Sequence, residues 1–70
     1  MKLTIIVERD PESGWLVGSV AELPGCQTQA PDLATLDANV REAIDAYLGE
    51  GEPSEPLPEF VGVHRVEIAR

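Results

Sequence analysis

The stretch that decides the fold is ELPGCQTQ, residues 22–29, with the tripeptide Leu23-Pro24-Gly25 near its centre. Pro24 fixes its own φ, and Gly25 can adopt φ values that other residues avoid. Such a pair ends one strand sharply and starts another. We therefore expect a strand over residues 15–21 before this turn and a short strand over residues 25–29 after it.

Upstream of the turn, the sequence predicts a β-hairpin. Residues 2–9 alternate between apolar and polar side chains, except that Ile6 interrupts the pattern, which indicates partial cover on the second face as well. Residues 10–14 (DPESG) have the composition of a turn, so residues 15–21 are expected to pair antiparallel with residues 2–9. In the second strand, alternation predicts one face with Leu16, Gly18 and Val20 and the other with Trp15, Val17 and Ser19.

Downstream of the turn, one amphipathic helix is predicted over residues 33–48. Its apolar residues recur at steps of three and four and form one stripe: Leu33, Leu36, Val40, Ala43, Ile44, Tyr47 and Leu48. Asp32 is a good N-cap, because its carboxylate can accept hydrogen bonds from the free N–H groups of the first turn. Gly49 suits the position that follows the last helical residue.

The last third of the chain predicts a connector and a final strand. Residues 49–59 hold three prolines and four glutamates, which favours a stiff, solvated connector. Residues 60–69 are rich in β-branched side chains and are expected to form a strand. Their apolar residues change phase near His64, so either a bulge lies there or both faces of the strand are covered.

These elements predict an α+β fold of order βββαβ, a three-stranded antiparallel meander with one helix on one face and a final strand parallel to the first. Seventy residues make one domain, over residues 1–70, that buries only about 60% of the surface of its unfolded chain. The single cysteine, Cys26, excludes an internal disulfide, and no Cys/His cluster suggests a structural metal. We therefore expect a homo-oligomer, a dimer or tetramer, in which the exposed sheet edges pair between chains.

The charge distribution limits the possible partners. Thirteen acidic and five basic residues give a formal net charge of −8. Because affinity for phosphate needs clustered Lys and Arg, we expect no direct nucleic-acid binding. A cationic partner suits this surface, and acidity that serves only solubility is the open alternative. The chain shows neither a signal peptide at its start nor an apolar run of the length of a membrane span, so a cytoplasmic location is expected.

The order of these motifs resembles the N-terminal domain of HicB-like antitoxins. The resemblance rests on the acidic turn before Gly14-Trp15, on ELPGCQTQ, and on a cap residue followed by a helix that contains NVREAIDAYL (residues 39–48). It implies a shortened ribonuclease-H-type sheet with one helix. It also implies binding to a small basic HicA-type toxin, which cleaves messenger RNA with a catalytic histidine on a double-stranded-RNA-binding-like fold.

The chain departs from that family in two ways. Full-length members carry a C-terminal DNA-binding segment, helix-turn-helix or ribbon-helix-helix, and this sequence ends at Arg70 without one, so autoregulation by direct DNA binding is not expected. The helix start reads Pro31-Asp32 where the family often has Gly followed by Asp or Thr, a small change because Asp still caps.

The expected function is therefore non-catalytic occlusion of a toxin, with no cofactor and no metal. The residues expected to contact the partner are Glu50, Glu52, Glu55, Glu59, Trp15 and Phe60, and the residues that define the fold are Leu23, Pro24, Gly25 and Asp32. The alternatives are that the four glutamates belong to a solvated linker and that the two aromatic residues fill the core. The alternative function is an orphan oligomeric binding module of unknown ligand with no toxin partner.

A degenerate nuclease is the third hypothesis, since ribonuclease-H-type sheets can hold two Mg²⁺ ions between carboxylates. The available carboxylates are those of Glu8, Glu42 and Asp45. Glu42 and Asp45 lie off the apolar stripe of the helix, so convergence is not expected. Cys26 is interpreted as a small packed hydrophobe, and His64 as a surface or structural residue rather than a catalytic one.

Overall fold

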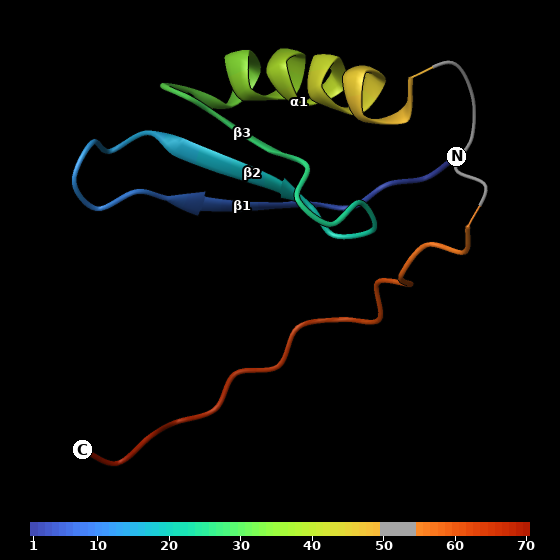
Figure 1. Ribbon diagram of the computed structural model, residues 1–70. Coiled ribbons are helices and arrows are strands. Elements are labelled where there is room, and N and C mark those ends of the chain that lie inside the picture. The colour runs from blue at the N-terminus through green and yellow to red at the C-terminus, as the bar shows by residue number, and fades with distance from the viewer. Residues whose placement is uncertain (50–54) are drawn as a thin grey trace.

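The computed structural model describes residues 1–49 and 55–70. Its elements are β1 (Ile5–Arg9), β2 (Leu16–Val20), β3 (Gln27–Ala30) and α1 (Leu33–Leu48), arranged as a sheet of order β1-β2-β3 with the helix on one face (Figure 1). Both strand pairs are antiparallel. The α+β class, the meander and the helix are confirmed. The helix has the expected bounds, and the strands differ from those expected by up to three residues at an end.

The Leu23-Pro24-Gly25 turn ties β2 to β3 as the sequence predicts. Gly25 has a φ of 85°, in the left-handed region that favours glycine. Backbone N–H groups of Leu23 and Cys26 donate to the carbonyl oxygens of Val20 and Leu23, at 3.1 and 2.9 Å. Leu23 is fully buried and Cys26 lies beside it in the core, so the turn supplies packing as well as a reversal of direction.

The core lies between α1 and the face of the sheet that carries Leu16, Gly18 and Val20, the face expected from alternation. Gly18 is the point of closest approach. A Cβ built on it lies 3.2 Å from Cγ2 of Val40 and 3.3 Å from side-chain carbons of Ile5 and Leu36. The absence of a side chain at Gly18 therefore lets α1 pack closely on β2. The buried hydrophobic residues among those described are Val20, Leu23, Cys26, Ala30, Leu36 and Val40.

Local chemistry sets both ends of α1. Asp32 has extended backbone dihedrals, and its Oδ1 accepts from the backbone N–H of Thr35 at 2.7 Å. That hydrogen bond lowers the pKa of Asp32. At the other end, Gly49 has a φ of 64° and its N–H donates to the carbonyl oxygen of Asp45 at 3.0 Å. The helix therefore begins after Asp32 and ends before Gly49, as the sequence predicts.

Two residues of the apolar stripe are less buried than expected. Leu33 is 63% exposed and Tyr47 is 46% exposed, although both lie in register with the buried Leu36 and Val40. Tyr47 is therefore not a core residue. Its hydroxyl donates to the carbonyl oxygen of Pro24 at 2.9 Å and ties the last turn of α1 to the turn before β3.

The final strand expected over residues 60–69 is not formed within the described chain. Residues 55–70 contain no helix or strand, and the segment runs away from the sheet (Figure 1). Leu57 packs against the core, and the residues that follow it are exposed. A strand needs a neighbouring strand for its backbone hydrogen bonds, and within residues 1–49 and 55–70 no strand of the sheet pairs with the segment. Of the connector expected over residues 49–59, residues 50–54 lie outside the described residues.

Candidate functional site

The helix does not cover the sheet evenly. Its backbone lies beside β3 and β2 and not beside β1. On the β3 side, Ala30 is fully buried, and Nδ2 of Asn39 donates to the carbonyl oxygen of Gln29 at 3.3 Å. On the β1 side, Val7 points to the same face as Gly18 and yet is 44% exposed. The offset leaves the helix-facing side of β1 open.

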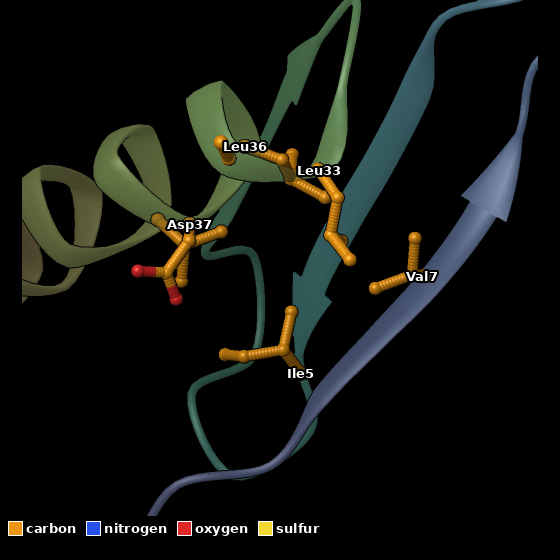
Figure 2. A pocket seen from close by; sticks show the side chains of 7 residues that line it. Ile5, Val7, Leu33, Leu36 and Asp37 are labelled. Carbon is orange, nitrogen blue, oxygen red and sulfur yellow. The ribbon is translucent and has the colours of Figure 1, made fainter.

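An apolar groove of about 460 Å³ occupies this open space. Ile5 and Val7 rise from β1 toward Leu33 and Leu36 at the start of α1 (Figure 2). Ala34 and Val40 complete its apolar lining. A groove of this kind can bind apolar side chains, because few polar groups line it.

Asp37 is the one charged residue in the groove lining. Its Oδ2 accepts from Nε of Arg41 at 3.0 Å, and this hydrogen bond raises the pKa of Arg41. Both side chains are largely exposed, at 64% and 77%, so the pair stabilises the helix only modestly. Asp37 thus places a negative charge at the edge of the groove, and its side chain stays largely exposed to solvent.

The outer surface of α1 continues this negative charge. Asp37, Glu42 and Asp45 are exposed along the helix, and Arg41 is the single basic residue of α1. Glu55 and Glu59, beyond the helix, are exposed as well. The described part of the chain therefore carries exposed acidic residues on α1 and beyond it, of which Asp37 lines the apolar groove. We call these five acidic residues the acidic surface.

Two of the residues expected to contact a partner, Glu50 and Glu52, lie outside the described residues. The others do not all lie at one end of the sheet. Trp15 follows the β1–β2 turn at one end, while the C-terminal segment, described from residue 55, starts toward the other end (Figure 1). Trp15 and Phe60 are 42% and 37% exposed, so each is only half covered within one chain. Their role in binding stays a prediction.

The carboxylates considered for a nuclease lie on different layers. Glu8 pairs with Val17, so its side chain lies on the face of the sheet that is turned away from α1. Glu42 and Asp45 lie on α1 itself. Within residues 1–49 and 55–70, no group of three or more His, Cys, Asp or Glu side chains is placed to hold a metal ion. Cys26 is buried in the core, as expected, and His64 is exposed in the C-terminal segment.

Pattern reasoning missed the clamp at the start of β1. The backbone N–H and the hydroxyl of Thr4 donate to the two carboxylate oxygens of Glu22, each at 2.7 Å. These bonds lower the pKa of Glu22. They join the N-terminal end of β1 to the loop after β2. The groove was missed too, since its residues belong to two elements whose relative placement the periodicity does not define.

Three relatives share one family name, and two of them match nearly the whole chain. A UPF0150 protein of Archaeoglobus fulgidus is 46% identical over 68 residues, which are 97% of this chain and 96% of that protein. The chain belongs to the UPF0150 family. A UPF0150 protein of Thermotoga maritima is 34% identical over 65 residues, 93% of this chain and 87% of its own length. A third UPF0150 protein, of Thermoplasma acidophilum, is 44% identical over 48 residues, 69% of this chain and 68% of its own length.

No family model and no solved structure matches this UPF0150 chain. Its match to the Archaeoglobus relative leaves only two of its 70 residues outside the alignment, so the C-terminal segment belongs to the same family unit as the sheet and helix. Among the described residues of this UPF0150 protein, no helix has the length and apolar character needed to cross a membrane.

Proposed function

We propose that this UPF0150 protein is an antitoxin-like protein of the cytoplasm, which binds and occludes a small basic HicA-type mRNA-cleaving toxin. The resemblance of residues 10–51 to HicB-like antitoxins suggests the toxin class. The observation that carries the proposal is the acidic surface of α1 and the connector, with Arg41 as the one base of the helix. In this proposal the chain performs no reaction and needs no cofactor or metal.

The mechanism is competition for the toxin's RNA-binding surface. Residues 1–59 carry twelve acidic and three basic residues, a net charge of 3 − 12 = −9. Such a field attracts a basic protein and speeds the encounter. Carboxylates then occupy the positions where the toxin binds RNA phosphates, and the half-exposed Trp15 and Phe60 are available as apolar anchors.

Growth rescue tests the biological claim directly. The product of the open reading frame adjacent to this gene, which the proposal expects to be a small basic protein, is expressed with and without this chain, and colony growth is scored. Expression of the basic protein alone is expected to stop growth, and co-expression is expected to restore it. Continued arrest despite a stable, soluble antitoxin-like chain would reject the proposal.

Charge reversal tests the acidic surface itself. Glu55→Lys with Glu59→Lys is expected to weaken binding of the same basic protein about tenfold at low salt, and less at high salt, where screening is stronger. Glu8→Lys with Glu12→Lys makes the same change of charge on β1 and its turn and serves as the control. Equal weakening by both pairs would show a general effect of net charge rather than a contact surface.

The second candidate is an orphan oligomeric binding module with no toxin partner. The open apolar groove beside β1 favours it, because a groove of this kind suits an apolar partner rather than a basic RNA-binding surface. A chain that self-associates but neither rescues growth nor retains any basic protein would support this second function. In both proposals the protein is a homo-oligomer, dimer or tetramer.

A further inference from the structure

We propose that residues 60–69 of one copy form a fourth strand beside β1 of a second copy, and that the reciprocal exchange builds a twofold dimer. This specifies the self-association that forms part of the proposed function, and it does not require the toxin. Each copy then gives its C-terminal segment and receives that of its partner over the apolar groove.

The donated segment is exposed and forms no strand within its own chain. Val61, Val63, Val66 and Ile68 are 91%, 83%, 70% and 69% exposed. Four β-branched side chains within eight residues are typical of a strand that packs on something. The backbone of an extended segment also carries N–H and C=O groups that a sheet edge would pair. The segment thus has the side chains and the backbone of a strand, and lacks only the edge to bind.

The receiving edge is that of β1. In the part of the chain that the structure describes, β1 is an outer strand and pairs only with β2, since the sheet order is β1-β2-β3. Beside it lies the groove lined by Ile5, Val7 and Leu33, in the space that α1 leaves uncovered (Figure 2). The other outer strand, β3, already receives a hydrogen bond from Asn39 and is covered by α1. A fourth strand therefore completes the sheet at β1 and puts apolar side chains over the groove.

The connector directs the segment to a second copy. Leu57 packs against the core of its own chain and lies between Pro56 and Pro58. Proline fixes φ and restricts the residue before it, so the chain cannot fold back sharply at this point. The segment accordingly leaves the body of the molecule (Figure 1). Ten extended residues span about 33 Å, enough to run along the whole of β1 in a neighbouring copy.

Charge favours the same pairing. Residues 60–70 contain Arg65, Arg70 and Glu67, a net charge of 2 − 1 = +1, while residues 1–59 carry −9. The most basic part of the chain is thus attached to an acidic body and is free to meet the acidic body of another copy. Asp37 adds a carboxylate at the groove that receives the segment.

The phase change within the segment gives the donated strand apolar residues on both faces. Val61 and Val63 lie on one face of a regular strand and Val66 and Ile68 on the other. The face toward α1 fills the groove. The opposite face continues the open side of the sheet, where Ile6 is 37% exposed. In the proposed dimer the apolar residues on one face of the strand are buried in the groove, and those on the other face extend the apolar surface around Ile6.

The test uses the full chain and two measurements. Sedimentation equilibrium compares the wild type with V63P/V66P, which removes two backbone donors from the segment, and with V63T, which retains a β-branched side chain there. The wild type is expected to be a dimer, the double proline variant is expected to weaken it about a hundredfold, and V63T is expected to change it far less. A monomeric wild type, or a dimer indifferent to both prolines, overturns the proposal.

The second measurement needs no variant. Mixed ¹⁵N-labelled and ¹³C-labelled wild-type chains are examined for isotope-filtered nuclear Overhauser effects. Contacts between residues 60–69 of one label and β1 of the other support the exchange. Contacts only within one label, only between two C-terminal segments, or to β3, overturn it. Loss of toxin binding or rescue affects neither measurement, so failure of the toxin proposal and failure of the exchange are distinguishable.

Discussion

The two outer strands of the sheet differ in what covers them. β3 lies beneath α1, with Ala30 fully buried and the carbonyl oxygen of Gln29 bonded to Asn39. β1 has the same kind of pleated backbone, but Val7 and Ile6 are 44% and 37% exposed on its two faces. The comparison shows that the apolar residues are buried on the β3 side of the sheet and partly exposed on the β1 side. We infer that burial of the β1 side by a second copy adds to the stability of this small domain.

The largest expected effect contrasts two leucines of α1. Leu36 is 1% exposed on the covered side, and Leu33 is 63% exposed at the groove. Leu36→Ala is expected to lower the free energy of unfolding by about 2–5 kcal/mol, because it removes buried atoms and leaves a cavity. Leu33→Ala is expected to cost less than about 0.5 kcal/mol in the V63P/V66P background. Urea denaturation measures both.

Leu33→Ala is also measured in the wild-type background. If the groove receives the segment of a second copy, Leu33→Ala lowers the free energy of unfolding more in the wild-type background than in the V63P/V66P background. Equal costs in the two backgrounds would show that the β1 side stays open.

A second prediction concerns the close approach of α1 to β2. Gly18→Ala places a methyl group 3.2 Å from Val40, and we expect a loss of about 1–3 kcal/mol from overpacking. Gly62→Ala in the V63P/V66P background, where pairing of the segment is disrupted, is the control, since a Cβ there meets nothing within 4 Å in the single chain. The readout is thermal unfolding. A neutral Gly18→Ala would mean that α1 can slide toward β1 and that the offset is not fixed by this contact.

A third prediction concerns the anchor of α1 on the covered side. Tyr47→Phe removes the hydroxyl that donates to the carbonyl oxygen of Pro24 at 2.9 Å. We expect a loss of about 0.5–1.5 kcal/mol, in the range of a single hydrogen bond. Amide hydrogen exchange should rise in the last turn of α1 and leave β1 unchanged. Faster exchange in β1 instead would contradict the separation of the two sides.

The smallest effect concerns acid pH and the clamp that holds β1. The hydrogen bonds from Thr4 lower the pKa of Glu22 below its usual value in the folded chain. A carboxyl with a depressed folded pKa stabilises the fold above its unfolded pKa, and that contribution is lost as the pH falls through the folded value. Glu22→Gln is therefore expected to lower stability at pH 7 slightly and to flatten its decline below about pH 4.5.

Glu12→Gln, in the β1–β2 turn, is the matched control for that titration. Denaturant midpoints from pH 7 to pH 2 give the comparison. If both variants decline with pH as the wild type does, the clamp contributes nothing to acid stability.

The sequence by itself determined the features that depend on local chemistry. Gly25 allows the turn, Asp32 begins the helix, and Gly49 ends it, because each acts through its own φ or its own side chain. Alternation gave the buried face of β2, since neighbouring side chains of a strand must point to opposite sides. Burial of Cys26 was expected from its chemistry and was confirmed.

Only the tertiary structure decided where the helix lies across the sheet. The apolar stripe predicts that α1 packs on the sheet. The close approach of Val40 and Leu36 to Gly18 sets the position of α1 over β2 and β3. The groove, the exposure of Leu33 and the bond from Tyr47 to Pro24 all follow from that offset. Residues 60–69 show the same limit. β-Branched side chains predict a strand, but a strand forms only beside an edge, and local sequence does not specify which chain supplies that edge.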